Sequence, residues 1–428
     1  MAQSLRRIYN KLKMRKLNFW IIQRAEQTVY DDRNARLMRS GIIANLLEAR
    51  GHKVTLWTST FNHMEHKQRF DKSNLIKISD NFTIQFIKSI GYKKNFSLRR
   101  LIDEKYISLQ FKSLLSLHKK PDVILISMPS IELGYEASKY AKKNQIPFFV
   151  DIRDLWPDVF YDVSKAIFHP LIFPIYKYYD FKLKKLLYNS TGIIALTESY
   201  LKWGLKKINR KISIEDKVIN MGYINDTQIK NPAVKNNSIE KLNINNFKLV
   251  VTFIGTLGKT NNLEPVLEAA RRIEDKQKKI LFIVCGSGEK LNFYKSKYSN
   301  LSNVTFMGWL DGIKIREILK ISDVGILPYI ESNNYKYNIP NKPAEYMSEG
   351  LVLASSLNDG ELYSLIAESN IGFSYKHNSD ILMLELENLL NKPNLVLQLK
   401  KNSITTFETH FNAKKLYNDL VQHIEREI

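Results

Sequence analysis

Four short segments of the sequence place groups that could bind an anion or move a proton directly after apolar runs. They are Phe253–Lys259 (FIGTLGK), Cys285–Glu289 (CGSGE), Ile339–Gly350 (IPNKPAEYMSEG) and Asp151–Pro157 (DIRDLWP). In the first two, glycines let backbone N–H groups approach a phosphate at a helix start, and Lys259 adds a cation. Neither is a dinucleotide fingerprint or a Walker A loop. A plain tight turn explains either alone, but two such turns after successive strands indicate an anion site.

The third segment predicts a helix whose first turn carries a cation and a carboxylate. Pro340 fixes the entry, and Pro343 is tolerated in a first helical turn. Lys342 can neutralise a phosphate there, and Glu345 can accept hydrogen bonds from a ribose diol. An exposed capping segment is the alternative. The apolar run Leu351–Ala354, which restores a buried strand directly afterwards, favours the ligand site.

The fourth segment gathers two carboxylates and a guanidinium at the end of a predicted strand. Asp151 and Arg153 share one side of an extended strand, whereas Asp154 lies on the other. A structural Asp–Arg pair is the alternative to a catalytic role. His63-Met-Glu-His66 matches no common zinc spacing and reads as a loop, so we predict no metal site. We also expect Ser287 to cap the helix that follows the second turn.

Strands alternate with helices in both halves of the chain, which predicts βαβ units and parallel sheets. In the first half we predict strands at 17–23, 53–59, 82–89, 122–128, 147–152, 192–197 and 218–223, and helices at 34–50, 98–117, 131–143 and 173–188. In the second half we predict strands at 249–254, 280–284, 304–307, 324–327 and 351–354, with helices starting near residues 263, 289, 313 and 342 and over the last fifty or so residues.

The fold class is therefore α/β, with two Rossmann-like domains in tandem. Residues 225–246 have no periodicity and look like a linker. We assign residues 1–230 to the first domain, 231–410 to the second, and 411–428 to a final helix that can cross back to the first. Ligands bind beyond the carboxyl ends of parallel strands, so we expect the two domains to face one interdomain cleft.

Composition and charge narrow the functional classes. The chain has 428 residues, 44% hydrophobic and 25% charged, as in an ordinary globular protein. Cys285 is the only cysteine, which excludes an intrachain disulfide, and no apolar run approaches the ~18–20 residues of a spanning helix. Together these features favour a cytoplasmic protein.

Positive charge is concentrated in the first half. The net charge is +22; residues 1–230 hold 41 basic and 21 acidic residues, a balance of +20, whereas residues 231–428 hold 24 and 22, a balance of +2. This asymmetry suggests a polyanionic partner such as nucleic acid, anionic lipid or a phosphorylated substrate. A compositional bias that serves solubility is the alternative, but it does not explain the asymmetry.

Five motifs, in order, resemble those of the family 4 retaining glycosyltransferases, which use nucleotide sugars and have the GT-B fold. The motifs are Arg153–Pro157 (RDLWP), Gly255–Lys259 (GTLGK), Gly286–Glu289 (GSGE), Gly308–Leu310 with Ser322–Tyr329 (GWL, SDVGILPY), and Ile339–Gly350. Each is loose, but five in this order are quite specific. The resemblance covers almost the whole chain from Leu17, and it is strongest to bacterial O-antigen and capsule polysaccharide enzymes.

The resemblance implies that a hexosyl or N-acetylhexosaminyl group moves from a UDP- or GDP-linked donor to a glycan, with retention of configuration. It implies a role in cell-surface polysaccharides such as lipopolysaccharide, capsule or exopolysaccharide. No cofactor or metal is expected, because helix N-termini and lysines would stabilise the departing diphosphate. The donor-binding residues it implies are Gly255, Thr256, Gly258, Lys259, Gly286, Gly288, Glu289, Asn341, Lys342 and Glu345, and the catalytic residues are Asp154, Lys342 and Glu345.

Three positions depart from the family pattern. The first member of the carboxylate pair E-x7-E is Tyr337, the frequent arginine of the diphosphate site is Thr256, and the Gly-Gly often found after the first strand is missing from residues 24–34.

The acceptor implied by the resemblance is a polyprenyl-diphosphate-linked or other glycan, and the first domain would bind it. Such an acceptor lies at the inner face of the cell membrane. Two basic, aromatic stretches, Tyr92–Lys120 and Ile172–Tyr188, would associate peripherally with its anionic surface. The same stretches could instead pack their apolar faces into the domain core.

Two other functions remain open. A GT-B epimerase acting on UDP-GlcNAc would share this architecture. A nucleic-acid-binding protein would explain the isoelectric point of about 9.6, but RRM, KH and zinc-finger signatures are absent, so we expect no nucleic-acid partner. A nicotinamide dehydrogenase needs a glycine fingerprint after the first strand, and residues 23–34 contain no glycine.

Overall fold

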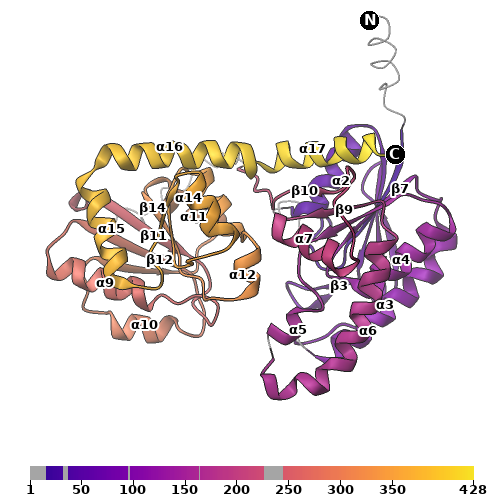
Figure 1. Ribbon diagram of the computed structural model, residues 1–428, viewed down its shortest axis with the longest axis horizontal. Coiled ribbons are helices and arrows are strands. Elements are labelled where there is room, and N and C mark those ends of the chain that lie inside the picture. Colours follow the sequence, from indigo (N-terminus) through magenta and orange to yellow (C-terminus); the bar gives the residue numbers. More distant parts are fainter. Residues whose placement is uncertain (1–15, 32–36, 95–96, 163, 226–243) are drawn as a thin grey trace, which may run out of the picture. The chain divides into compact units, whose positions relative to one another are not determined.

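The computed structural model describes residues 16–31, 37–94, 97–162, 164–225 and 244–428 (Figure 1). The chain forms two compact units, Met1–Ile219 with Lys414–Ile428, and Asn220–Ala413. The boundary placed at residue 230 from the sequence lies outside the described residues, as does most of the expected linker. The final helix, α17 (Ala413–Arg426), belongs from Lys414 onward to the first unit.

The first unit is built on one eight-stranded sheet. In spatial order its strands are β10 (Lys217–Val218), β9 (Gly192–Ala195), β8 (Phe148–Ile152), β7 (Val123–Ser127), β1 (Asn18–Ile22), β2 (Lys53–Ser59), β6 (Phe82–Ile87) and β5 (Asn74–Lys77). All neighbours are parallel except β5, which runs antiparallel to β6. The central strands are apolar and buried along nearly their whole length, as expected where helices cover both faces.

The helices of the first unit lie between these strands along the chain. They are α2 (Arg39–Ala49), α3 (Leu98–Leu114), α4 (Ile131–Lys143), α5 (Val159–Asp162), α6 (His169–Tyr188) and α7 (Glu198–Lys207), with short 3₁₀ turns η1 (Leu115–Leu117) and η2 (Ala166–Phe168) and a hairpin of β3 (Phe61–Asn62) and β4 (Lys67–Gln68). Helix α4 packs against both α3 and α6 (Figure 1). Gly51, at φ +86°, ends α2 as the sequence predicts.

The second unit has a fully parallel six-stranded sheet. The order is β13 (Val304–Gly308), β12 (Ile280–Cys285), β11 (Leu249–Ile254), β14 (Val324–Leu327), β15 (Val352–Ser355) and β16 (Gly372–Ser374). Alternate residues of β11 enter two separate cores, with Val251 and Phe253 on one face and Val250 and Ile254 on the other. From β11 the chain adds strands on one side of the sheet (β12, β13), and from β14 it adds them on the other side (β15, β16). Ligands bind at this switch point between β11 and β14 in such folds.

Helices cover both faces of the second sheet. They are α9 (Glu264–Asp275), α10 (Leu291–Lys297), α11 (Gly312–Lys320), α12 (Asn333–Tyr337), α13 (Asn341–Ser348), α14 (Glu361–Glu368), α15 (Ser379–Asn391) and α16 (Pro393–His410), with the 3₁₀ turn η3 (Ile244–Asn246). In the sheet of the first unit, the corresponding switch in strand order lies between β1 and β7. Both units are therefore Rossmann-like α/β folds, as predicted.

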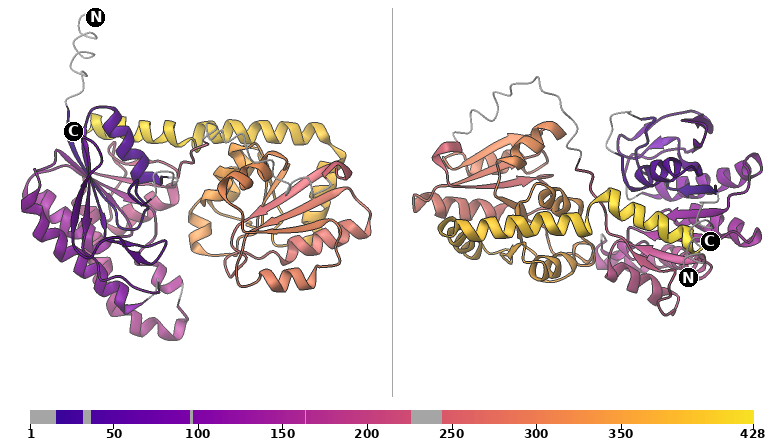
Figure 2. Two further views of the ribbon diagram at one scale, coloured as in Figure 1. Left: turned by 180° about the vertical axis from the view of Figure 1, so that it is seen from behind. Right: turned by 90° about the horizontal axis from the view of Figure 1, so that it is seen from above.

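Helix α17, at the yellow C-terminal end of the ribbon in Figure 2, belongs from Lys414 onward to the first unit and is held there by ion pairs. Glu425 pairs with Arg50 at 2.5 Å and with His52 at 2.7 Å, and Asp419 pairs with Lys217 at 2.8 Å. The strand expected at 218–223 is only two residues long, because the chain leaves the sheet after Val218 and Tyr223 instead bridges to Asn412. Among the described residues, no helix is long and apolar enough to span a membrane.

Candidate functional site

The turns after β11 and β12 are locked together by backbone hydrogen bonds. Gly255 N donates to Cys285 O at 3.0 Å, Leu257 N donates to Ser287 O at 2.9 Å, and Lys290 N donates back to Leu257 O at 2.9 Å. Because β11 and β12 are parallel neighbours, the two glycine segments meet at the carboxyl edge of one sheet. The sequence predicted two such turns after successive strands, and the structure joins them. We call the two joined turns, Gly255–Lys259 and Gly286–Glu289, the ledge.

Glycine is required at two positions of this ledge. Gly286 has φ +142°, and a Cβ there would lie 1.8 Å from Gly255 O. Gly288 has φ +149°, and a Cβ there would lie 2.4 Å from Leu257 O. A side chain at either position would therefore clash with backbone of the facing turn and also strain its own backbone. Two bare backbone turns in close contact leave peptide groups, rather than side chains, to face a ligand.

The ledge presents both backbone and cationic groups to solvent. Thr256, Lys259, Ser287, Gly288 and Glu289 are exposed, Gly255 and Gly286 are half-buried, and Gly258 is buried. Asn261 Nδ2 donates to Thr256 O at 2.9 Å and so stiffens the first turn. The expectation that Ser287 caps the next helix is wrong. Helix α10 begins later, after Lys290, because Ser287 O is used to bond Leu257 N in the facing turn.

Helix α13 places Lys342 and Glu345 together in its first turn. Lys342 Nζ lies 2.6 Å from Glu345 Oε2, and Tyr223 Oη donates to Glu345 Oε1 at 3.4 Å. Glu345 is buried, Lys342 is half-buried and Asn341 is exposed. The predicted cation and carboxylate are therefore both present, and they neutralise each other where no ligand is bound.

The next residue of α13 anchors the helix to the sheet. Tyr346 Oη accepts a hydrogen bond from Ile254 N, the last residue of β11, at 2.9 Å. The tyrosine ring lies against Gly325 of β14, where a Cβ would come within 2.2 Å of the ring. This contact fixes α13 beside β11 and β14, the two strands between which the strand order switches. The charge of Lys342 also reaches Cys285 at the end of β12, although burial is the larger effect and raises the pKa of that thiol to about 12. Cys285 is therefore an unreactive core residue.

An exposed tryptophan stands beside the ledge. Trp309 is 73% exposed and follows Gly308, whose carbonyl accepts a hydrogen bond from Gly286 N at 2.6 Å. The indole combines an apolar ring with a polar N–H group, which suits it to contact a ligand at a surface. The sequence motif GWL contained this residue, but the candidate site did not include it, because only the strand pairing reveals that β13 ends next to the second turn.

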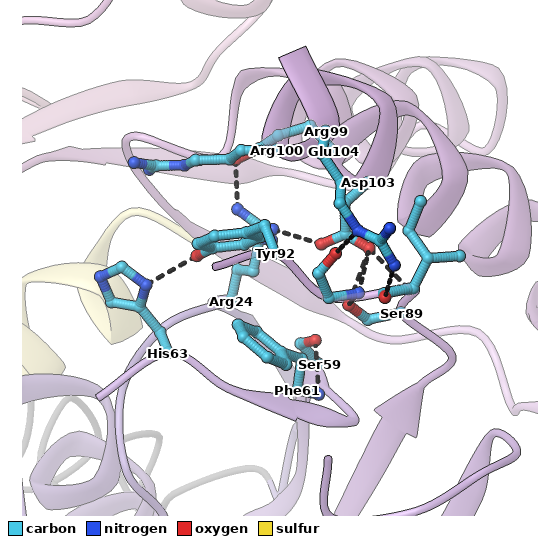
Figure 3. Close-up of polar contacts among 12 residues, drawn as sticks. Arg24, Ser59, Phe61, His63, Ser89, Tyr92, Arg99, Arg100, Asp103 and Glu104 are labelled. Carbon is cyan, nitrogen blue, oxygen red and sulfur yellow. Dashed lines mark hydrogen bonds and ion pairs between the residues drawn. The ribbon is translucent and has the colours of Figure 1, made fainter. Parts of the chain in front are cut away.

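In the first unit, polar side chains gather beyond the carboxyl ends of β1, β2 and β6 (Figure 3). Arg24 pairs with Asp103 and Glu104, each at 2.5 Å, and all three side chains are buried. Asp103 also accepts from Ser89 Oγ and from Ile90 N, both at 2.7 Å. These bonds join the loops after β1 and β6 to α3. Arg100 also lies 3.9 Å from Glu104, so two guanidinium groups face two carboxylates and the first role of the cluster is structural.

His63 lies at the edge of this cluster. Its Nδ1 is 2.6 Å from Tyr92 Oη, and burial together with the positive charges of Arg100 and Arg24 lowers the pKa of His63 to about 4. The imidazole is therefore neutral at physiological pH and can bond a hydroxyl group. His66 Nδ1 bonds Tyr92 O at 3.2 Å. Within the described residues, no group of three or more His, Cys, Asp or Glu side chains could hold a metal ion.

Asp151 belongs to a buried ion-pair network. It bonds Arg39 Nε at 2.9 Å, Arg39 Nη2 at 3.0 Å and Arg153 Nε at 2.7 Å, and Arg153 also pairs with Glu26. Burial acts to raise the pKa of Asp151, but the two arginines outweigh it and hold that pKa below the ordinary value. Asp151 thus joins α2 to β8. This is the structural Asp–Arg pair that the sequence offered as the alternative to a catalytic role.

Asp154 has a different environment. It is half-buried, its Oδ1 accepts a hydrogen bond from Leu155 N at 2.8 Å, and burial raises the pKa of its carboxyl group against the opposing effects of that bond and of Arg100. A carboxylate with a raised pKa binds a hydroxyl proton more strongly than an ordinary one. Asp154 belongs to the first unit, whereas Lys342 and Glu345 belong to the second.

Residues 234–406 match the family model described as glycosyl transferases group 1. The matched range contains both glycine turns, Trp309 and α13. The match supports a glycosyltransferase domain in this part of the chain. None of the curated protein sequences compared with the chain matches it.

Solved glycosyltransferase structures share the whole fold at low sequence identity. The chain resembles sucrose-phosphate synthase from Thermosynechococcus elongatus at 15% identity, with 96% of this chain and 99% of that chain covered and a TM-score of 0.68. It resembles WaaG, a glycosyltransferase involved in lipopolysaccharide biosynthesis, at 14% identity, with 94% and 98% covered and a TM-score of 0.60. Anabaena HepE, solved in complex with UDP and glucose, matches at 10% identity, with 96% and 100% covered and a TM-score of 0.61. The fold is therefore GT-B, with two Rossmann-like domains.

Proposed function

We propose that the protein transfers a sugar from a UDP- or GDP-linked donor to a glycan acceptor with retention of anomeric configuration. The observation that carries this proposal is the ledge of two interlocked glycine turns, close to the Lys342–Glu345 pair, in the domain that matches group 1 glycosyltransferases. HepE, which shares the fold, is solved in complex with UDP and glucose. That supports a nucleotide sugar as the donor.

On the donor side, the ledge and α13 have complementary roles. The exposed backbone of the two turns and Lys259 bind the diphosphate. Lys342 adds charge to the phosphate that departs, and Glu345 accepts hydrogen bonds from the ribose hydroxyls. These fixed dipoles and cations stabilise the nucleoside diphosphate as it leaves, so the proposed reaction needs no divalent metal.

On the acceptor side, Asp154 is the residue that contacts the reacting hydroxyl. Its raised pKa makes it a good hydrogen-bond acceptor for that group. The acceptor oxygen bonds the anomeric carbon, the bond from that carbon to the diphosphate breaks, and the hydroxyl proton moves to the diphosphate. We propose a lipid-linked glycan as the acceptor, in the synthesis of a cell-surface polysaccharide, with the protein bound peripherally to the inner face of the cell membrane.

The test is a panel of UDP- and GDP-sugars incubated with the full chain and a bacterial membrane-lipid extract, with and without EDTA. We expect one donor to release its nucleoside diphosphate only when the extract is present, at a rate unchanged by EDTA. The anomeric configuration of the product, measured by NMR, should match that of the donor.

Other outcomes of this panel contradict the proposal. Inversion of configuration would exclude a retaining mechanism, and loss of turnover in EDTA would exclude metal independence. Conversion of UDP-GlcNAc to its 2-epimer without an acceptor would show an epimerase instead.

A further inference from the structure

Three neighbouring helices of the first unit, α3, α4 and α6, hide their acidic residues and expose their basic ones. Together they contain eleven Lys and Arg residues and five Asp and Glu residues. All five acidic residues are buried: Asp103, Glu104, Glu132, Glu136 and Asp180. Eight basic residues are exposed: Arg99, Lys112, Lys139, Lys142, Lys143, Lys177, Lys184 and Lys185. The described outer surface of these helices carries positive charge and no exposed carboxylate.

The buried carboxylates are used within the helical layer. Lys182, itself buried, lies 2.7 Å from Glu132, and this pair joins α6 to α4. Glu136 lies 3.5–3.8 Å from Lys139 and Lys112, and the latter contact joins α4 to α3. Asp180 pairs with Lys207 of α7 and with the exposed Lys184 at 2.7 Å. Lys112, Lys139 and Lys184 are thus partly offset by buried carboxylates, whereas no ion pair with a carboxylate is seen for the exposed Arg99, Lys142, Lys143, Lys177 and Lys185 within the described residues. The surface charge thus follows from the packing of the layer and not from composition alone.

The same layer exposes large apolar side chains on and just before α6. They are Ile167 (78% exposed), Phe168 (51%), Leu171 (74%), Phe173 (50%), Phe181 (56%) and Tyr188 (72%). Along α6 they alternate with Lys177, Lys184 and Lys185, and its one acidic residue, Asp180, is buried and pairs with Lys207 and Lys184. Contiguous exposed apolar groups mark an interaction surface. We call the exposed residues of α3, α4, η2 and α6 the basic helical face.

We propose that the basic helical face docks on an anionic lipid bilayer. Aromatic and aliphatic side chains enter the boundary between headgroups and acyl chains, while lysines keep their charge among the headgroups. A second copy of this chain is a poor occupant, because it brings another net charge of +22. Nucleic acid would match the charge, but its bases stack on aromatic rings and offer no acyl chain for the exposed aliphatic side chains of Leu171 and Ile167. The docking names the surface for the peripheral membrane binding in the proposed function, and it can be tested without the reaction.

The test is cosedimentation of the full chain with phosphatidylcholine vesicles that contain no anionic lipid or about a third phosphatidylglycerol. We expect binding to the anionic vesicles alone, weakened at least tenfold between 50 and 500 mM salt by charge screening. The variant Lys177→Glu/Lys184→Glu/Lys185→Glu should bind at least tenfold more weakly than the wild type. Leu171→Ser/Phe181→Ser should also weaken binding, with less dependence on salt.

A matched variant in the second unit controls for net charge. Lys279, Lys295 and Lys401 are all exposed, so Lys279→Glu/Lys295→Glu/Lys401→Glu changes the total charge by the same amount. We expect its vesicle binding to stay within about threefold of the wild type. Equal weakening in the two triple variants would overturn the proposal, as would tighter binding to duplex or single-stranded nucleic acid than to vesicles at the same salt.

Thermal unfolding and nucleotide titration of each variant separate loss of docking from misfolding and from loss of the donor site. An unchanged midpoint of thermal unfolding shows that a variant is folded. Titration of each variant with UDP and GDP reports separately on the proposed donor site. If a variant loses vesicle binding but keeps nucleotide binding, the loss concerns only the basic helical face. If the wild type docks on vesicles but binds no nucleotide, the proposed donor site is contradicted and the docking is not.

Discussion

Lys342 Nζ and Glu345 Oε2 lie 2.6 Å apart, one helical turn from each other on α13. Tyr346, the residue after Glu345, is bonded to the end of β11, so the position of the pair is set by the core of the domain. A donor that binds at this point must separate the two charges or bond both of them. The pair is therefore the part of the site where substrate binding and electrostatics are most directly coupled.

Replacing either member of this pair should impair turnover. Lys342→Ala and Glu345→Ala each remove a charge-assisted hydrogen bond worth about 1.5–3 kcal/mol, so we expect each to lower kcat/KM roughly tenfold or more. The double variant should lose less than the sum of the two, because each single variant leaves its partner uncompensated. Steady-state kinetics of the three variants measures this, and wild-type kinetics in both single variants would remove the pair from the donor site.

The ledge should not tolerate a side chain. Gly288→Ala places a Cβ 2.4 Å from Leu257 O at a left-handed φ, so the two turns must separate. We expect at least a tenfold loss of nucleoside diphosphate affinity in calorimetric titration. Gly312→Ala is the control, because its Cβ meets no atom within 4 Å and its φ is not positive, and it should bind as the wild type does. Full affinity in Gly288→Ala would show that the ledge does not hold the diphosphate.

Trp309 should stack on the nucleobase of the donor. Stacking of a base on an aromatic side chain is worth about 1–3 kcal/mol, so Trp309→Ala should weaken nucleoside diphosphate binding about tenfold, while Trp309→Phe keeps most of the affinity. Inorganic pyrophosphate, which has no base, should bind both variants equally. Phe293→Ala, which removes another exposed aromatic side chain of the same unit, should have no effect. The idea fails if Trp309→Ala and Phe293→Ala behave alike.

Asp154 should affect the reaction and not donor binding. We expect Asp154→Asn to lower kcat at least tenfold, and to leave nucleotide affinity within a few-fold, because Asp154 belongs to the unit without the glycine turns.

The raised pKa of Asp154 also predicts an effect on stability. A carboxyl group whose pKa is raised by folding stabilises the protein below its unfolded pKa and loses that contribution as the pH rises through the folded pKa. Asp154→Asn should therefore raise Tm at pH 7 and not at pH 3. Loss of nucleotide binding in this variant would place Asp154 on the donor side.

Asp151 should show the opposite pH dependence. Arg153 and Arg39 hold its pKa below the ordinary value, so its contribution is present above the unfolded pKa of about 4 and is lost as the pH falls through the folded pKa. Asp151→Asn leaves two buried guanidinium groups undercompensated and should cost about 3–5 kcal/mol of unfolding free energy at pH 7. Denaturant unfolding from pH 3 to 7 measures both effects. Asp80→Asn, which breaks the exposed pair with Lys77, should change nothing measurable. A constant stability difference across this pH range would contradict the network.

The order of the elements could be predicted because their signals are local. β2, β11, β14 and α4 have the predicted bounds, since each is a continuous apolar run or a helical pattern bounded by turn residues. The strand β5 and the hairpin of β3 and β4 were not predicted. They are short elements formed by local antiparallel pairing: β3 and β4 make a separate two-stranded sheet, and β5 is an edge strand that carries little of the apolar pattern of a buried strand.

The candidate site was predicted residue by residue but not as an arrangement. Glycines after strands and a Lys-x-x-Glu helix start are visible in sequence. The hydrogen bonds that join the two turns depend on which strands are neighbours, and so does the position of Trp309 beside Gly286. The sequence presents His63 only as part of a His-x-x-His pair. Its neutral imidazole depends on Arg24 and Arg100, which only the fold brings near it.

Hydrogen–deuterium exchange of the full chain, with and without saturating UDP or GDP, tests the donor site most directly. Peptides that cover residues 255–260, 286–290 and 341–346 should exchange more slowly with the nucleotide that binds, while peptides from β7 and α4 of the first unit should be unchanged. Bound nucleotide that leaves all three segments unprotected, or that protects only segments of the first unit, would contradict the assignment of the ledge and α13 to the donor.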